Sequence, residues 1–343
     1  MPPLLLAAPD KFRGTLTATD AAAAIAEGAR GAGWLCDEAP LSDGGEGFVD
    51  VLATYGSLRH TTVLGPLGHP VGARWLLGED HDGELGTTAI IEAAQAVGLV
   101  LAGGRAGNDP LAAGTAGVGQ LVLAAVKAGA RHIVVGTGGS ASTDGGLSTV
   151  DLLAPPGRRG KAQLAGVQIT VACDVQTLFV EAATVFAPQK GASPAQVELL
   201  RRRLEKLADH YLERFGVDVR DLAGSGSAGG LAGGLAVLGA ELVPGFEFVA
   251  QRLGLAERVA RADLVVTGEG HFDEQSFAGK ATGGVIAMAR GAGAPVLVVA
   301  GDGAPGLDFI SLSERFGLAR ATSDTAACVT EVVRAQLALG PTG

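Results

Sequence analysis

The chain has 343 residues, enough for two domains of ordinary size. Hydrophobic residues make up 47% of it and charged residues only 18%, which excludes a disordered or fibrous protein. The net charge of −10 disfavours binding to nucleic acid or to an anionic membrane surface.

Further features point to a cytoplasmic, soluble protein with a small-molecule partner. Cys36, Cys173 and Cys328 are too few and too scattered for a disulfide framework. The first residues lack the basic region of a signal peptide, and no stretch approaches the roughly 18 unbroken apolar residues of a membrane span. We therefore expect neither nucleic acid nor membrane as a partner. The oligomeric state stays open, with a homo-oligomer as one option.

The predicted elements alternate between strands and helices along the chain. The first strand is expected over residues 4–6, and Thr15, Thr17 and Thr19 mark the start of the following helix. Ser193 and Pro194 mark the start of another helix, the most polar one. The remaining strands are expected at the end of 65–77 and over 132–135, 168–172, 262–266 and 295–300. This alternation predicts βα units with parallel strands, whose ligands bind at the carboxyl ends of the strands.

The apolar βα units at both ends of the chain suggest a discontinuous domain. We expect residues 1–64 and 261–343 to form one α/β domain. Residues 65–260 are expected to form a second α/β domain that carries the glycine-rich loops.

The stretch GTGGSASTDGG, residues 136–146, follows a predicted strand and combines glycines with hydroxyl side chains. Such a loop offers unhindered backbone N–H groups to a phosphate. Residues 136–141 also fit the dinucleotide pattern G-x-G-x-x-A, and residues 224–229 fit G-x-G-x-x-G, but neither has the full strand and carboxylate context of a Rossmann site. Because both loops match this pattern in part, a nicotinamide-dependent oxidoreductase of a small hydroxy acid stays as the alternative function. No Walker A motif is present.

Carboxylates stand among glycines at several predicted strand ends. Each one alone is explained by turn formation, but together they suggest that Mg²⁺ bridges protein and phosphate, as in phosphoryl transfer. Loop cations are the candidates for phosphate or carboxylate contact. The carboxylates are Asp43, Glu46, Asp144, Asp174, Glu269 and Asp273, and the cations are Lys11, Arg13, Lys190 and Lys280.

Taken in order, these motifs resemble those of the bacterial type-1 glycerate kinases. The motifs are APDKFRG, SDGGEG, GPLGHPV, GTGGSASTDGG, VACDV, FAPQKGA, GSGSAGGLAGGLAVLGAELVPG and ADLVVTGEGHFDEQSFAGK. The resemblance implies ATP-dependent phosphorylation of D-glycerate with Mg²⁺, usually to the 2-phosphate. It also implies two α/β domains with the active site in the cleft between them.

Four features depart from the family pattern. Ser142-Thr143 replaces a usual Thr-Asn pair, and the Asn-Pro that commonly follows the Asp174-Val175 pair is missing. Thr282 stands where proline is usual, and the stretch between Gly146 and Val167 is short. None of these departures removes a candidate carboxylate or lysine.

The expected fold is α/β, with a Rossmann-like parallel sheet covered by helices on both faces in one domain and a smaller α/β lobe as the second. Asp174, Asp144, Lys11 and Asp273 are the catalytic candidates. Gly138, Gly139, Ser140, Gly226, Gly229, Lys190 and Lys280 are expected to bind ATP. Lys11, Arg13, Asp43 and Glu46 are expected to bind the substrate, and Asp144, Asp174 and Glu269 to bind Mg²⁺.

Two questions and two further alternatives stay open. The residues do not decide which carboxylate is the base and which binds metal, or whether the 2- or the 3-hydroxyl is phosphorylated. A kinase of a related hydroxy acid and a non-catalytic sensor of a phosphorylated metabolite are the further alternatives.

Overall fold

The computed structural model describes residues 2–79, 86–155, 164–277 and 280–338. The chain divides into two compact units. The first unit consists of Met1–Asp43 and Phe246–Gly343, and the second unit is Gly44–Gly245. Both combine helices with a β-sheet, which confirms the α/β prediction. Within the described ranges, no helix is both long enough and apolar enough to cross a membrane.

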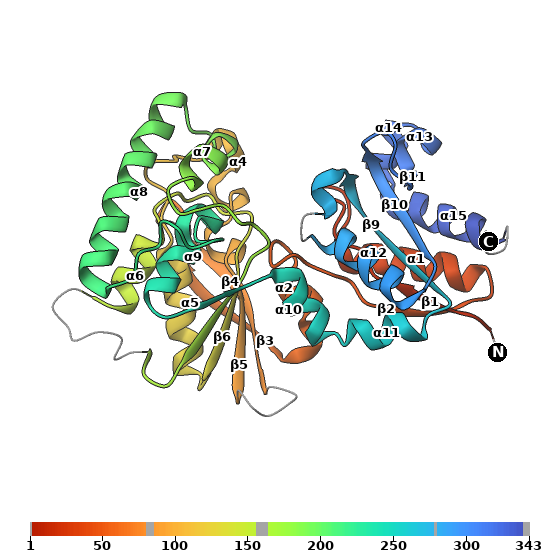
Figure 1. Cartoon of the computed structure of the whole chain (residues 1–343), viewed down its shortest axis with the longest axis horizontal. Coiled ribbons are helices and arrows are strands. Elements are labelled where there is room, and N and C mark those ends of the chain that lie inside the picture. Colours follow the sequence, from red (N-terminus) through yellow and green to blue (C-terminus); the bar gives the residue numbers. More distant parts are fainter. Residues whose placement is uncertain (1, 80–85, 156–163, 278–279, 339–343) are drawn as a thin grey trace. The chain divides into compact units, whose positions relative to one another are not determined.

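The first unit is built on a five-stranded sheet with the order β11-β10-β9-β1-β2, in which every neighbouring pair is parallel (Figure 1). Its strands are β1 (Leu4–Ala7), β2 (Leu35–Glu38), β9 (Leu264–Phe272), β10 (Val296–Gly303) and β11 (Ile310–Ser311). Its helices are α1 (Ala18–Gly31), α10 (Gly245–Arg252), α11 (Leu255–Arg261), η5 (Glu274–Phe277), α12 (Ala281–Ala292), α13 (Leu312–Phe316), α14 (Leu318–Ser323) and α15 (Thr325–Ala338).

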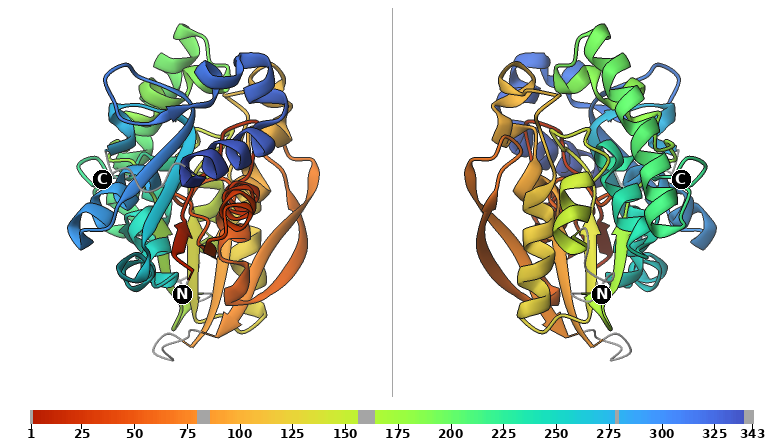
Figure 2. Two further views of the ribbon diagram at one scale, coloured as in Figure 1. Left: turned by 90° about the vertical axis from the view of Figure 1, so that its right-hand side faces the viewer. Right: turned by 90° about the vertical axis from the view of Figure 1, so that its left-hand side faces the viewer.

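Helices cover both faces of this sheet, as a Rossmann-like fold requires. Successive strand side chains point to opposite faces, so Val299 packs in one apolar cluster with α1 and α15. Its neighbours Val298 and Ala300 pack in another cluster with Ile286 of α12. Helices α1 and α15 lie side by side (Figure 2), because Gly28 lets them approach: a Cβ there would lie 2.7 Å from the carbonyl oxygen of Thr330.

The second unit holds a six-stranded mixed sheet with the order β3-β4-β5-β6-β7-β8. The pairs β3–β4 and β4–β5 are antiparallel, and the pairs from β5 to β8 are parallel. The strands are β3 (Ser57–Leu64), β4 (Pro70–Glu79), β5 (Thr87–Glu92), β6 (His132–Gly136), β7 (Gln168–Ala172) and β8 (Glu241–Val243).

The helices of this unit enclose its apolar core. Tyr211 and Phe179 are its largest fully buried side chains, and their ring centroids lie 6.0 Å apart. The helices are α2 (Phe48–Val51), η1 (Ala53–Tyr55), α3 (Ala94–Val97), η2 (Val100–Ala102), α4 (Gly104–Gly107), α5 (Ala116–Lys127), α6 (Leu147–Leu153), α7 (Ala182–Phe186), η4 (Pro188–Lys190), α8 (Pro194–Phe215) and α9 (Ser227–Val237).

The two helix starts predicted from the sequence are confirmed. Thr17 caps α1, because its hydroxyl accepts a hydrogen bond of 3.1 Å from the amide of Asp20. Ser193 caps α8 in a capping box with Gln196, and Pro194 occupies the first helical position. The strands predicted over 4–6, 132–135, 168–172, 262–266 and 295–300 correspond to β1, β6, β7, β9 and β10.

The unit boundaries lie earlier in the chain than the boundaries predicted at 64 and 260. Residues 44–64 fall in the second unit because β3 pairs with β4 along its whole length, from Ser57 to Leu64. Helix α11 falls in the first unit, where Arg258 forms a 2.6 Å ion pair with Asp37. The second unit, expected to be the smaller one, contains more of the chain because it holds the larger sheet and the long helix α8.

Candidate functional site

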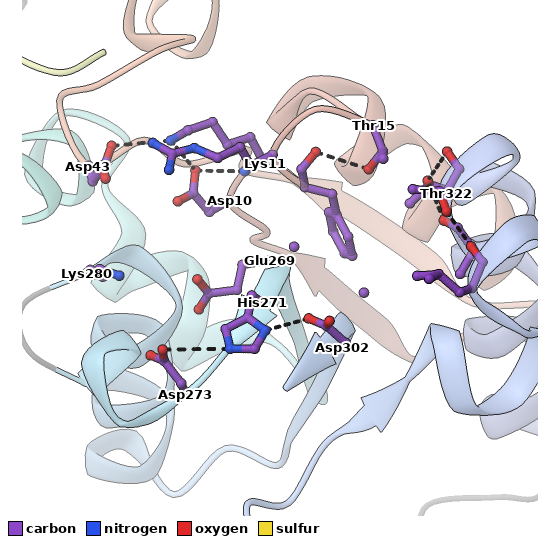
Figure 3. A pocket seen from close by; sticks show the side chains of 17 residues that line it. Asp10, Lys11, Thr15, Asp43, Glu269, His271, Asp273, Lys280, Asp302 and Thr322 are labelled. Atoms are coloured by element: carbon purple, nitrogen blue, oxygen red, sulfur yellow. Dashed lines mark hydrogen bonds and ion pairs between the residues drawn. The ribbon is translucent and has the colours of Figure 1, made fainter. Parts of the chain in front are cut away.

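The first unit contains a pocket of about 530 Å³ at the carboxyl ends of β1, β9 and β10 (Figure 3). This is the edge at which parallel sheets bind ligands. Most of its charged lining comes from the loop after β1, from β9 and from the end of β10. Six residues predicted from the sequence line it together: Lys11, Arg13, Asp43, Glu269, Asp273 and Lys280.

Lys11 is a cation of this pocket that two carboxylates hold in place. Its ammonium nitrogen lies 3.4 Å from Asp10 Oδ1 and 3.4 Å from Asp43 Oδ1. Figure 3 shows the three side chains together in the pocket. Burial lowers the pKa of Lys11, but the charges of Asp43 and Asp10 outweigh burial and hold the pKa above its ordinary value. Lys11 therefore stays charged over the whole neutral range.

Asp10 was not predicted, although it stands beside Lys11 after the first strand. It is 8% exposed, and its Oδ1 accepts a 2.7 Å hydrogen bond from the amide of Lys11. Burial raises the pKa of Asp10 to about 7, against the opposing charge of Lys11. The signal that selected the other carboxylates, an acidic residue just after a strand, applied here too.

Glu269 lies inside β9, which continues to Phe272 instead of ending before the predicted loop. Its Oε1 atom is buried and has no hydrogen-bond partner in the part of the chain that the structure describes. Burial raises the pKa of Glu269, while the hydroxyls of Ser276 and Thr282 and the charge of Lys280 lower it. Thr282, one of the departures from the family pattern, thus supplies a polar group that a proline would not.

His271 and Asp302 also line the pocket and were not predicted as site residues. His271 Nδ1 lies 2.5 Å from Asp302 Oδ1, and its Nε2 lies 3.8 Å from Asp273 Oδ2 (Figure 3). The hydrogen bond to Asp302 raises the pKa of His271. Asp273 also stabilises η5, because its Oδ1 accepts hydrogen bonds from the amides of Gln275 and Ser276.

In the second unit, the glycine-rich loop 136–146 connects β6 to α6. Several of its glycines are required for close packing. A Cβ on Gly138 would lie 2.6 Å from Gly45 Cα, and a Cβ on Gly136 would lie 2.5 Å from the carbonyl oxygen of Gly44. Gly44 and Gly45 of SDGGEG therefore pack directly against this loop.

The same loop keeps backbone donors available on its outer side. Among the described residues, the amides of Gly138, Gly139 and Ser140 have no hydrogen-bond acceptor. Gly139 is exposed and has φ +62°, a conformation that favours glycine. Free amides in a short glycine-rich loop are suited to an anion such as a phosphate group.

Lys190, predicted to bind ATP, points into the second unit. It is 4% exposed, and its ammonium nitrogen donates to Ser140 Oγ at 3.0 Å and to the carbonyl oxygen of Ser142 at 2.6 Å. Burial lowers the pKa of Lys190 to about 7, against the opposing charge of Asp144.

Asp144 and Asp174 differ in how they are held. Asp144 Oδ2 accepts from the amide and hydroxyl of Thr115, at 3.0 and 2.9 Å, and from the amide of Ser148 at 3.3 Å, while Oδ1 accepts from the amide of Gly146 at 3.1 Å. Asp174 lies just after β7, where its Oδ1 accepts a 2.6 Å hydrogen bond from the amide of Gly245. Asp144 therefore has a structural task that occupies both of its oxygens.

The second glycine loop packs against the first. A Cβ on Gly229 would lie 2.1 Å from the carbonyl oxygen of Ser142, and a Cβ on Gly226 would lie 2.4 Å from that of Leu178. The amide of Gly226 already donates to Thr177 at 3.0 Å. Their conformation and contacts explain these two glycines without a ligand. Glu46, the remaining predicted residue, is exposed in the second unit and does not line the pocket.

Magnesium was predicted at Asp144, Asp174 and Glu269. Within residues 2–79, 86–155, 164–277 and 280–338, no three His, Cys, Asp or Glu side chains gather to hold a metal ion. Mg²⁺ is commonly bound by one or two carboxylates together with substrate phosphates. The unpartnered Oε1 of Glu269 fits such a ligand, whereas the occupied oxygens of Asp144 fit poorly.

Comparison with known proteins gives a consistent result. The model of the glycerate kinase family matches residues 5–154 and 158–335. The glycerate 2-kinase of Escherichia coli is 38% identical over 330 residues, covering 87% of this chain and 84% of that protein. The glycerate kinase of Bacillus subtilis is 36% identical over 328 residues, covering 87% and 84%. A crystal structure of a putative glycerate kinase 2 from Salmonella typhimurium LT2 superimposes with a TM-score of 0.76 at 33% identity, covering 99% of this chain and 100% of that one.

Proposed function

The chain belongs to the glycerate kinase family, and on this premise we propose that it transfers the γ-phosphoryl group of ATP to D-glycerate, giving 2-phosphoglycerate. Family membership makes the chain an enzyme, a phosphotransferase with a small-molecule substrate. The choice of the 2-hydroxyl is supported by the name of the Escherichia coli relative, glycerate 2-kinase.

The observation that carries the proposal is the pocket in which six predicted residues meet. Glycerate brings a carboxylate, which needs a cation at neutral pH. Lys11 supplies one, because Asp10 and Asp43 keep it charged, and Arg13 lines the same pocket. We assign the binding of the glycerate carboxylate to Lys11 and Arg13.

The reaction joins a hydroxyl oxygen of glycerate to the γ-phosphorus while the bond from that phosphorus to the β–γ bridging oxygen breaks. ADP leaves, and the hydroxyl proton passes to a carboxylate. Asp174 is the candidate acceptor, since the oxygens of Asp144 are occupied by four donors. An ordinary carboxylate suffices, because a loose transition state makes little demand on early deprotonation.

The protein otherwise acts by positioning groups and neutralising charge. The free amides of Gly138, Gly139 and Ser140 are suited to a phosphate group of ATP. Mg²⁺ neutralises phosphate charge when it is bound, and Glu269 is the carboxylate that we assign to it.

Family membership disfavours the two alternatives outside the kinases, an oxidoreductase and a sensor. The pattern at 136–141 that suggested a dinucleotide is explained by loop packing against Gly44 and Gly45. A cytoplasmic location remains part of the proposal, supported by the few, scattered cysteines.

The test is ADP formation by the purified enzyme from ATP with D-glycerate, L-glycerate or no acceptor, with Mg²⁺ and with excess EDTA. We expect turnover that requires both D-glycerate and Mg²⁺. Turnover with another hydroxy acid but none with glycerate would keep the chemistry and change the substrate. NADH or NADPH consumption without any ADP formation would contradict the proposal.

A further inference from the structure

The buried side of the glycine-rich loop is held by two side chains from elsewhere in the second unit. Lys190 Nζ donates to Ser140 Oγ and to the carbonyl oxygen of Ser142, at 3.0 and 2.6 Å. Asn108 Nδ2 donates to the carbonyl oxygen of Ala141 at 3.1 Å, so the hydrogen bonds reach three consecutive loop residues.

The side chain of Asn108 is also bonded to the backbone of Lys190. Asn108 Nδ2 donates a second hydrogen bond, 2.9 Å long, to the carbonyl oxygen of Lys190. Both acceptors of Asn108 are carbonyl oxygens, which fixes the orientation of its carboxamide because only the NH₂ group can donate. Helix α4 ends just before Asn108 and η4 ends at Lys190, so two separate segments converge on the loop.

The position of Lys190 argues against direct phosphate contact. The side chain is 4% exposed, and its nitrogen already donates to two loop oxygens. Among the loop amides without an internal acceptor in the described residues, those of Gly138 and Gly139 belong to the more exposed residues at the start of the loop. The hydrogen bonds of Lys190 to Ser140 and Ser142 thus constrain the loop backbone that directly follows these exposed amides.

We propose that Lys190 and Asn108 form a clamp that positions residues 140–142 of the glycine-rich loop, and that Lys190 acts through the loop without touching a phosphate group. The inference rests on the proposed function of this loop as the phosphate site. It makes both side chains positioning residues. The lowered pKa of Lys190 is consistent with this role, because a neutral amine still donates hydrogen bonds while a phosphate ligand gains from a full charge.

The first test is hydrogen exchange in the ligand-free full-length protein, read on peptides that cover residues 136–147. Lys190→Met keeps the length and apolar stem of the side chain but removes its donors. We expect exchange to become at least tenfold faster in this segment, as on losing one or two buried hydrogen bonds. Asn108→Ala should accelerate the same segment, whereas Lys206→Met, which removes an exposed lysine of α8, should not. Unchanged exchange in both clamp variants would overturn the proposal.

The second test separates a clamp from a phosphate ligand by kinetics. Each clamp variant is expected to lower kcat/KM for ATP by roughly tenfold to a hundredfold. Because both side chains act on one loop, kcat/KM of the double variant should be little lower than that of the less active single variant. If the two residues acted independently, their fold-losses in kcat/KM would multiply. Multiplicative losses, with unchanged exchange in Lys190→Met, would identify Lys190 as a phosphate ligand and overturn the clamp.

Folding and function failures are distinguishable. If Lys190→Met does not fold, both experiments can be done with Lys190→Gln and with Asn108→Ala, since Asn108 is only half-buried. A wild-type enzyme without glycerate-dependent ADP formation would contradict the proposed function, while the exchange experiment on the ligand-free protein would still decide the clamp.

Discussion

At the scale of single residues, Asp10 links the chemistry of the pocket to pH. Its carboxyl is buried beside Lys11, and burial raises its pKa from the ordinary 3.8 to about 7 in the folded protein. Between these two values the folded state binds more protons than the unfolded state. The contribution of Asp10 to stability is therefore fully present below about pH 4 and is lost as the pH rises through 7.

Asp10→Asn should remove this pH dependence. The difference in free energy of unfolding, variant minus wild type, should therefore increase from pH 4 to pH 7 by an amount on the order of 3 kcal/mol, because only the wild type loses stability over this range. Urea unfolding at a series of pH values measures it, with the exposed Asp221→Asn as the control. Parallel pH profiles for Asp10→Asn and the wild type would show that Asp10 is not buried in this way.

Two aspartates of the second unit should respond differently to the same substitution. Asp174→Asn is expected to lower kcat by a hundredfold or more, the scale of a lost base or charge-stabilising group, while leaving stability nearly unchanged. Near-normal turnover of this variant would remove Asp174 from the site.

Asp144→Asn should instead lower stability, by about 1–3 kcal/mol, because an NH₂ group would replace an oxygen that now faces backbone donors. Thermal unfolding measured beside the kinetics separates the two effects. An Asp144→Asn variant of normal stability but without turnover would reverse the two assignments.

Sequence reasoning located much of the pocket but not the clamp. Lys11, Arg13, Asp43, Glu269, Asp273 and Lys280 were found because parallel strands gather their carboxyl ends at one edge, whatever the remaining fold is. The direction of Lys190 and the contacts of Asn108 depend on how distant segments pack, and no local pattern encodes that.

At the scale of elements, strand β9 determines the geometry of the pocket. The glycine-rich stretch after Val266 was predicted to be a loop, but β10 pairs with it as far as Phe272. Gly268 and Gly270 fit there because a Cβ would lie 1.9 Å from the carbonyl oxygen of Val299 and 2.9 Å from the amide nitrogen of Arg13, respectively. Glycine normally weakens a strand, which is why local sequence misled the prediction; here close backbone packing requires it.

Helix α12 allows a matched comparison of two glycines. A Cβ on Gly283 would lie 2.2 Å from the carbonyl oxygen of Ser276 in η5, whereas a Cβ on Gly291 would meet no atom within 4 Å. Gly283→Ala should therefore destabilise the protein by about 1–3 kcal/mol and displace η5, which borders the pocket. Gly291→Ala should stabilise it by about 0.5–1 kcal/mol through higher helix propensity.

Urea midpoints of the two variants measure this difference, and the KM for glycerate reports any displacement of η5. Equal midpoints for Gly283→Ala and Gly291→Ala would show that α12 and η5 do not pack as closely as described.

At the scale of the whole molecule, the chain forms one discontinuous and one continuous unit. The first needs both chain ends, because β1 pairs with β9 between Leu5 and Leu264. The second is the uninterrupted segment Gly44–Gly245 with its own sheet and core. The discontinuous pattern was predictable from the βα units at both ends. Its boundaries were not, because the sequence of β3 does not indicate that it pairs with β4 of the second unit.

A fragment comprising residues 44–245 should therefore fold by itself. We expect a cooperative urea transition and dispersed amide resonances, whereas a fragment of residues 1–43 should stay unfolded because its strands lack β9. A fragment 44–245 without a cooperative transition would contradict the division into units.

We propose that the enzyme phosphorylates the 2-hydroxyl of D-glycerate. The most direct measurement is phosphorus NMR of the product formed from ATP and D-glycerate in the presence of Mg²⁺. We expect one new phosphomonoester resonance, with the coupling of a phosphate on the secondary hydroxyl, and an equal amount of ADP. A phosphate on the primary hydroxyl, or ADP and inorganic phosphate alone, would contradict it.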